Sequence, residues 1–210
     1  MLLYYVTDRT QFPGDETARR RRLLEKIAEA SRAGLDYIQL RERDLSAQDL
    51  ETLAHAALHT IRENQGKHCT RFLINSRTDI AIACHADGVH LRSNDVTASD
   101  VRSVWRHAMK GPAIISISCH TAGEVAQTKA AGADLALFAA VFEKKDDPKI
   151  SGAGLSNLGE ACQRGIPVLA LGGITLRNAR SCCDAGATGV AAIRLFQKND
   201  IARVVRELRG

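Results

Sequence analysis

The sequence predicts a single-domain (β/α)8 TIM barrel, and three observations support that prediction. Short apolar runs alternate with amphipathic helical patterns about eight times along the chain, without a break. The glycine pair Gly172 and Gly173 follows the seventh apolar run, which is where barrels of this kind commonly bind phosphate. The length of 210 residues suits one sizeable core and lies near the lower end of the range for this fold. We therefore expect residues 1–210 to form one domain.

Each predicted strand is a short apolar run bounded by polar residues or by glycine, as expected for strands buried in a parallel sheet. In chain order the strands cover residues 2–6, 37–40, 72–75, 88–91, 113–118, 135–138, 168–171 and 189–193. Between them, apolar residues recur at helical spacing over residues 19–33, 47–63, 79–85, 98–107, 122–131, 155–164, 176–185 and 201–209. The alternation predicts that a helix follows every strand.

Three of the predicted helices end in a similar small-residue signature. Glycine stands directly after the helix at Gly34, Gly132 and Gly186, where it can adopt the left-handed conformation without steric cost. Such turns lie at the bottom of a barrel, so functional residues are expected at the opposite end, where the strands finish. A doubly wound open sheet would show the same alternation, but its glycine-rich fingerprint follows the first strand, and this chain has none there.

The composition excludes several other classes of protein. A hydrophobic fraction of 45% and a charged fraction of 25% are typical of a globular domain. No apolar stretch approaches the roughly 20 residues that cross a bilayer, and the amino terminus lacks the features of a signal peptide, so we expect no membrane partner. The net charge of +5 is scattered apart from the arginines at residues 19–22, and no aromatic platform for bases is visible, so we expect no nucleic-acid partner. The six cysteines lack regular spacing, which favours reduced thiols and a cytoplasmic location.

Polar residues at the ends of the second, third and fourth strands are candidates for binding a diphosphate. Gln39, Arg41 and Arg43 alternate along the chain, which places them on one side of the strand. Two guanidinium groups suit a diphosphate because each can bind phosphate oxygens bidentately, although an arginine–glutamate lattice supporting the barrel is an equally good interpretation. Asn75 and Asp95 offer oxygen ligands that could share Mg²⁺ with a diphosphate, although Asp95 also suits a capped turn.

The fifth strand ends in a hydroxyl and an imidazole. Ser118 and His120 lie on one side by alternation, which makes them candidates for acid–base work at the rim. Thr121 is well placed to cap the helix that begins directly after it. His90, on the fourth strand, is interpreted as a packed structural histidine in preference to a ligand. A serine hydrolase is not supported, because the chain has no G-x-S-x-G motif.

The last two strands offer a candidate phosphate site. Gly172 and Gly173 follow the seventh strand, and Ile193 and Arg194 lie at the end of the eighth. Backbone N–H groups exposed at a glycine turn can hold phosphate. The long irregular stretch at residues 143–154 follows the sixth strand and is a candidate mobile loop near this end of the barrel.

At these residues the chain resembles the thiamine phosphate synthase and TenI-like family of barrels, over nearly its whole length. The matching stretches are residues 5–8, 39–42, 74–75, 86–91, 117–121 and 171–174. The resemblance implies an enzyme that joins a hydroxymethylpyrimidine diphosphate to a thiazole phosphate carboxylate and releases diphosphate with Mg²⁺ present. In that reaction diphosphate leaves, a stabilised pyrimidine cation forms, and the thiazole nitrogen captures it. The resemblance also implies a homodimer.

Roles for individual residues follow from the same resemblance. Gln39, Arg41 and Asn75 would hold the pyrimidine diphosphate, Asp95 would bind Mg²⁺, and Ser118 would assist the leaving group. The thiazole phosphate would bind at Gly173, with the backbone near Ile193 and Arg194.

The chain departs from the family pattern at three places. It has Arg43 where synthases carry a lysine, and Ser76 where they carry a second magnesium-binding aspartate. Residues 142–149 replace a Pro-Thr-x-Thr-Lys loop, and Lys145 is the candidate to supply the missing lysine. These departures are compatible with a TenI-like thiazole tautomerase. Such an enzyme needs the phosphate site and an acid–base group such as His120, but it needs neither a metal nor diphosphate-binding residues.

Two further alternatives remain open beside the synthase and the tautomerase. One is a non-catalytic barrel that binds thiamine precursors, which predicts binding without turnover. The other is a different phosphate-binding barrel enzyme, such as a sugar-phosphate epimerase, which fits the fold but not the polar residues at the ends of the second and fifth strands. The retention of Gln39, Arg41 and Asp95 favours the synthase, and that is the function the sequence predicts.

Overall fold

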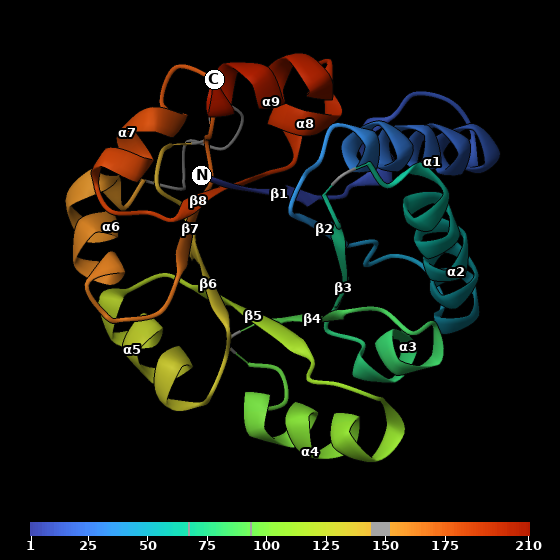
Figure 1. Cartoon of the computed structure of the whole chain (residues 1–210), viewed down its shortest axis with the longest axis horizontal. Coiled ribbons are helices and arrows are strands. Elements are labelled where there is room, and N and C mark those ends of the chain that lie inside the picture. Colours follow the sequence, from blue (N-terminus) through green and yellow to red (C-terminus); the bar gives the residue numbers. More distant parts are fainter. Residues whose placement is uncertain (67, 93, 144–151) are drawn as a thin grey trace.

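The computed structural model is a closed barrel of eight parallel strands surrounded by helices (Figure 1). It describes residues 1–66, 68–92, 94–143 and 152–210. The strands are β1 (Leu2–Val6), β2 (Tyr37–Leu40), β3 (Arg71–Asn75), β4 (Gly88–Leu91), β5 (Ile114–Cys119), β6 (Leu135–Ala139), β7 (Val168–Leu171) and β8 (Gly189–Ala192). Each strand pairs with the next along the chain, and β8 pairs with β1 to close the ring. The predicted fold is confirmed.

The predicted strands agree with the observed ones to within one residue at each end. The helices are α1 (Glu16–Arg32), α2 (Ala47–Asn64), α3 (Thr78–Ala83), α4 (Ala98–Ala108), α5 (Ala122–Ala130), α6 (Gly154–Cys162), α7 (Ala179–Asp184), α8 (Arg194–Gln197) and α9 (Ile201–Arg209), with a 3-10 turn η1 (Arg9–Gln11) after β1. The sequence prediction missed α8 and η1, because neither is long enough to show a helical period. No helix in the described part of the chain is long and apolar enough to cross a membrane.

Two helix starts differ from the prediction by three residues, and at each a side chain accepts a hydrogen bond from a nearby backbone N–H. Helix α1 begins three residues early, since the Asp15 carboxylate accepts a hydrogen bond from the Ala18 N–H at 2.8 Å. Helix α7 begins three residues late, since Asn178 holds the preceding segment in a turn by accepting from the Thr175 N–H at 2.7 Å. Thr121 caps α5 as expected, through a hydrogen bond from the Glu124 N–H.

The inside of the barrel is apolar on one side and polar on the other. Alternate residues of β1, β6, β7 and β8 form a small interior cluster of Tyr4, Val6, Leu135, Leu137, Leu169 and Ala191. A much larger apolar core fills the space between the strands and the helices. Buried polar side chains instead come from β2, β4 and β5, as Gln39, His90 and Ser116. Because buried polar groups need hydrogen-bond partners, this side of the interior requires a polar network.

The bottom of the barrel is tied by three carboxylates that immediately precede β2, β4 and β6. Each accepts a hydrogen bond from the backbone of the preceding strand and binds one arginine. The pairs are Asp36 with Leu3 N–H and Arg209, Asp87 with Phe72 N–H and Arg71, and Asp134 with Ile115 N–H and Arg102. We call these three groups the carboxylate clasps. Their position agrees with a stabilising role for this end of the barrel.

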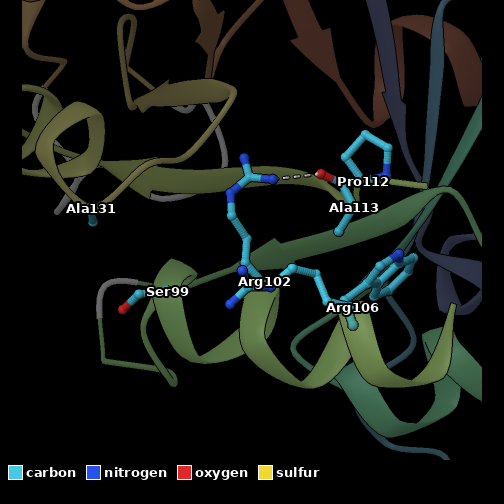
Figure 2. Close-up of a pocket in the computed structure, with 7 residues that line it drawn as sticks. Ser99, Arg102, Arg106, Pro112, Ala113 and Ala131 are labelled. Atoms are coloured by element: carbon cyan, nitrogen blue, oxygen red, sulfur yellow. Dashed lines mark hydrogen bonds between the residues drawn. The ribbon is translucent and has the colours of Figure 1, made fainter. Parts of the chain in front are cut away.

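The third clasp borders a surface pocket of about 340 Å³ between α4 and the segments that carry Pro112, Ala113 and Ala131 (Figure 2). Arg102 donates to the Gly132 carbonyl at 2.7 Å and to the Ala113 carbonyl at 3.2 Å, besides its ion pair with Asp134. Its charge is therefore used to join α4 to the turns before β5 and β6. The pocket contains none of the residues predicted to form the functional site.

Replacing Arg102 by alanine is expected to lower the free energy of unfolding by roughly 1–2 kcal/mol, because two carbonyls and a half-exposed ion pair lose their donor. Arg106→Ala is the matched control, since Arg106 lies one turn further along α4 with no hydrogen bond or ion pair among the described residues. Denaturant unfolding of both variants measures the difference. Equal losses in the two variants would contradict the role of the clasp.

Candidate active site

The carboxyl ends of β2, β3 and β4 bring three predicted residues together. Gln39 donates through Nε2 to Asn75 Oδ1 at 2.9 Å. Asn75 donates to Ser76 Oγ at 3.1 Å, and Ser76 in turn donates to Asp95 Oδ2 at 2.6 Å. Ser76 thus links Asn75 to Asp95. It does so in a left-handed backbone conformation (φ 62°) that few non-glycine residues adopt.

A second set of hydrogen bonds continues from Gln39 across the inside of the barrel. The Tyr4 hydroxyl lies 3.1 Å from Gln39 Oε1 and 3.2 Å from Ser116 Oγ. His90 joins Ser116 to Ser118, with both ring nitrogens 2.8 Å from a serine hydroxyl. The result is one interior hydrogen-bond chain of Asp95, Ser76, Asn75, Gln39, Tyr4, Ser116, His90 and Ser118.

The sequence prediction missed Tyr4 and Ser116 as members of this chain. Ser116 had a signal, because it lies two residues before Ser118 and so shares its side of β5. Tyr4 had none, because its contacts with Gln39 and Ser116 span 35 and 112 residues of sequence and exist only when the barrel closes.

The burial predicted for His90 is confirmed, and its environment keeps it neutral. Burial, with a smaller contribution from the Arg41 charge, lowers the pKa of His90 to about 3. The folded state therefore binds this proton more weakly than the unfolded state does. The corresponding stability is fully present above the unfolded pKa near 6.5 and is lost as the pH falls from 6.5 toward 3.

We expect His90 to make the folded protein sensitive to mild acid. Between pH 7 and pH 5.5 the free energy of unfolding should fall by up to about 1.4 kcal/mol per pH unit through this residue. The His90→Gln variant should lose that part of the slope, whereas His59→Gln, which removes an exposed histidine, should keep it. Denaturant unfolding across this range tests the comparison, and identical slopes in the two variants would contradict it.

Arg41 is half-buried and its guanidinium makes no hydrogen bond or ion pair with any described residue. Burial first, and then the neighbouring charge of Arg43, lowers its pKa from the ordinary value. Arg43 itself is exposed. An unpaired guanidinium that has lost part of its hydration is suited to binding an anion.

The neighbouring residue Glu42 explains how Arg41 is held. The Arg41 N–H donates to Thr7 Oγ1 at 2.9 Å, and Thr7 donates to Glu42 at 2.6 Å. Glu42 is buried and also binds Arg9, which donates to it from its backbone and its guanidinium. The arginine–glutamate lattice that the sequence allowed therefore exists, but it uses Arg9 and leaves the side chain of Arg41 available.

Asp95 is the candidate metal ligand. Its side chain is 10% exposed, and Oδ2 accepts from the Arg92 N–H at 2.8 Å as well as from Ser76, while Oδ1 binds the Arg92 guanidinium. Burial acts to raise the pKa of Asp95, but these hydrogen bonds outweigh it and hold the pKa below the ordinary value. Asp95 is thus ionised at neutral pH.

The donor set fits one kind of metal site. Among the described residues no group of three or more His, Cys, Asp or Glu side chains could form a cage around an ion. A single carboxylate fits Mg²⁺, which keeps several waters and is commonly shared with substrate phosphates.

The glycine turn after β7 is shaped by close contacts that exclude side chains. Gly172 and Gly173 have φ values of 96° and 66°. A Cβ atom on Gly172 would lie 2.7 Å from the Ala140 Cβ, and one on Gly173 would lie 2.7 Å from the Phe142 Cβ. The N–H of Gly173 donates to no acceptor among the described residues, so it can bind a ligand oxygen.

The remaining predicted residues lie around this rim. Ile193 is half-buried and directly precedes α8, and Arg194 is exposed at the first position of that helix. His120 is exposed beyond the end of β5, and its Nδ1 lies 2.6 Å from the Ala139 carbonyl oxygen. It has no hydrogen bond to Ser118, which instead turns inward to His90. Lys145 and most of the candidate loop lie outside the described residues.

Fold and site together define the class: a (β/α)8 barrel whose interior is polar on one side, with polar and charged side chains gathered at the carboxyl ends of β2, β3 and β4. The chain belongs to the thiamine monophosphate synthase family, whose model matches residues 3–196. It is 34% identical over 202 residues to the thiamine-phosphate synthase of Clostridium novyi (strain NT), covering 94% of this chain and 91% of that protein. It is 35% identical over 212 residues to the thiamine-phosphate synthase of Methanoculleus marisnigri, covering 99% and 93%.

A solved structure gives the same result. The chain is similar to a thiamine phosphate pyrophosphorylase from Pyrococcus furiosus, with a TM-score of 0.81 and 27% identity over 99% of this chain and 93% of that one. A 3-hexulose-6-phosphate synthase has a TM-score of 0.71 at 17% identity, and that likeness shows the fold alone.

Proposed function

We propose that this protein is a thiamine phosphate synthase. It joins 4-amino-2-methyl-5-hydroxymethylpyrimidine diphosphate to thiazole phosphate carboxylate, releasing diphosphate and, from the carboxylate, CO₂. The observation that carries the proposal is the unpaired, half-buried Arg41, two residues after Gln39, whose amide is hydrogen-bonded to Asn75. An enzyme that binds a diphosphate at the end of β2 needs such a charge there. A tautomerase, which binds one phosphate at the glycine turn after β7, does not. Full-length similarity to proteins named thiamine-phosphate synthase supports the same choice.

The residues act mainly by neutralising charge and fixing positions. Arg41, assisted by Arg43, binds the diphosphate and stabilises the charge that grows on it as the bond between carbon and oxygen breaks. Gln39 and Asn75 orient the pyrimidine, because their amides are fixed against each other. In this proposal Lys145 adds a further positive charge to the diphosphate.

The second substrate binds at the same end of the barrel, beside the carboxyl ends of β7 and β8. Gly173 and the backbone at Ile193 and Arg194 bind the phosphate of the thiazole and aim its ring nitrogen at the pyrimidine carbon. His120 and Ser118 border the space between the two substrates. When bound, Mg²⁺ would be held by Asp95 and would supply additional positive charge to the diphosphate.

The experiment is turnover by the purified protein of the two substrates, with Mg²⁺ and with EDTA, following thiamine phosphate and free diphosphate. We expect both products in equal amounts, with Mg²⁺ and not with EDTA. Absence of products in both buffers would contradict the proposal.

The second candidate is a TenI-like thiazole tautomerase, favoured by Ser76 in place of a metal-binding carboxylate and by the exposed His120. Interconversion of the thiazole tautomers in both buffers, without thiamine phosphate, would establish it. Binding of the precursors without either reaction would instead indicate a non-catalytic barrel.

We also propose that the protein is a homodimer acting in the cytoplasm, on the basis of the family resemblance and its six unpaired cysteines. Sedimentation equilibrium measures the first part directly. A molar mass near 22.8 kDa at micromolar concentration would contradict the dimer.

A further inference from the structure

The interior hydrogen-bond chain has a direction, and that direction can be assigned bond by bond from Asp95. The Ser76 hydroxyl donates its one proton to Asp95 Oδ2 at 2.6 Å, and the same oxygen accepts from the Arg92 N–H at 2.8 Å. Ser76 Oγ must then accept from Asn75 Nδ2, which turns Asn75 Oδ1 toward Gln39. Gln39 Nε2 donates to that oxygen at 2.9 Å, so Gln39 Oε1 faces Tyr4 as an acceptor.

The same reasoning continues through the centre of the barrel. Tyr4 gives its only proton to Gln39 Oε1, so its oxygen accepts from the Ser116 hydroxyl. Ser116 has then used its proton and must accept from His90 Nδ1, 2.8 Å away. A neutral imidazole with its proton on Nδ1 has an acceptor at Nε2, and the hydroxyl 2.8 Å from Nε2 is that of Ser118.

We propose that Asp95 fixes the direction of every hydrogen bond in this chain, so that Ser118 donates its proton to His90 and presents only lone pairs to the barrel mouth. Tyr4, Ser116 and His90 are positioning residues in this arrangement, since they act on the ligand only through Ser118 and Gln39. The burial of His90 agrees with this arrangement, because burial favours the neutral ring, which donates from one nitrogen and accepts at the other. A protonated ring would donate to both serines, and the Ser118 hydroxyl could then no longer donate to it.

The consequence for catalysis rests on the proposed function. A serine that offers only lone pairs suits a substrate group that donates a hydrogen bond or gains positive charge, as the pyrimidine does when diphosphate leaves. It is not suited to protonating the diphosphate. The role that the family resemblance implies for Ser118, assistance to the leaving group, therefore passes to Arg41, and Ser118 faces the cationic partner.

The test is ¹⁵N NMR of the histidine rings in the full-length protein at pH 7. The two nitrogens of a neutral imidazole have well separated shifts, so the protonated one is identified directly. We expect His90 to be neutral with its proton on Nδ1. A proton on Nε2, or a positively charged ring, would overturn the proposal without any variant being made.

Two variants test whether the direction is transmitted. Tyr4→Phe removes the link between Gln39 and Ser116. Tyr5→Phe removes an equally buried hydroxyl that donates to Gln197 and takes no part in the interior hydrogen-bond chain. We expect Tyr5→Phe to keep the Nδ1–H form, and Tyr4→Phe to show a mixture of both tautomers with kcat lower by about tenfold. Identical His90 spectra in the two variants would contradict transmission.

The outcomes separate this inference from the proposed function. The Nδ1–H form in a protein that makes no thiamine phosphate would support the direction of the chain and overturn the synthase. Turnover with the opposite tautomer would support the synthase and overturn the inference.

Discussion

Replacing Arg41 by glutamine is expected to lower kcat/KM for the pyrimidine diphosphate by about 10²–10⁴-fold. Each charge-assisted hydrogen bond contributes roughly 1.5–3 kcal/mol, and a guanidinium can make two of them to a diphosphate. The effect should appear in kcat as well as in KM, because the charge on the diphosphate grows as the bond breaks. Steady-state kinetics with the second substrate saturating measures both.

Arg43→Gln is the matched control for this prediction. Arg43 carries the same charge two residues further along the chain, but it is exposed, so water screens its interaction with a ligand. We expect a loss of kcat/KM below about tenfold, which shrinks further in high salt. If the two variants lose activity equally, the half-buried position of Arg41 is not what makes it important. If Arg41→Gln retains full activity, the diphosphate does not bind at the end of β2.

Replacing Gly173 by alanine is expected to raise KM for the thiazole phosphate by more than tenfold and to destabilise the protein by roughly 1–3 kcal/mol. The added Cβ would lie 2.7 Å from Phe142 Cβ and 3.0 Å from the Glu143 carbonyl oxygen, so the turn must move. Because the Gly173 N–H is a proposed phosphate donor, movement of the turn should weaken binding of this substrate and leave KM for the diphosphate unchanged.

The control is Gly111→Ala, at another glycine with positive φ. Gly111 has a φ of 92° and no atom within 4 Å of its added Cβ, so the substitution imposes backbone strain without a steric clash. We expect a loss of stability of about 1 kcal/mol and unchanged kinetics. Thermal unfolding and the two KM values together test whether the thiazole phosphate binds at Gly173. If Gly173→Ala lowers only the stability and leaves both KM values unchanged, the phosphate binds elsewhere.

The strands could be predicted almost to the residue, and the helix ends could not. Strands buried on both faces read as continuous apolar runs with sharp boundaries, as in residues 168–171. A helix boundary depends instead on which side chain bonds the nearby backbone. Asp15 caps α1 and Asn178 holds the turn before α7, and each helix begins three residues away from its predicted start. The three carboxylates before β2, β4 and β6 were visible in the sequence, but their partners depend on how neighbouring strands are aligned.

The part of the candidate site that lies at strand ends could be predicted from the sequence. The part that depends on closure of the barrel could not. Gln39 and Asn75 lie near the ends of β2 and β3, Asp95 follows β4, and hydrogen bonds join the three through Ser76. Their continuation to Ser118 passes through Tyr4, whose strand lies far away in sequence. Alternation predicted Ser118 and His120 on one side of β5, but it could not say that the Ser118 hydroxyl binds His90.

Ser76 stands where the family resemblance led us to expect an aspartate, and the structure shows what a serine does there. Its hydroxyl both accepts from Asn75 and donates to Asp95, which no ionised carboxylate at that position could do. The substitution therefore removes a negative charge and adds a link in the interior hydrogen-bond chain.

The first of the carboxylate clasps has a consequence for the order of folding. Asp36 accepts from the amide of Leu3, 33 residues before it, and binds Arg209, 173 residues after it, so one carboxylate joins β1 to α9. Contacts between such distant residues have the largest loop-closure cost and contribute most to slow folding. We expect the Leu3 amide to gain protection from hydrogen exchange only in the last phase of refolding, after the amide of Ile115, whose clasp spans 19 residues. In a pulse-labelling experiment, protection of the Leu3 amide from hydrogen exchange would therefore report the time at which the barrel closes.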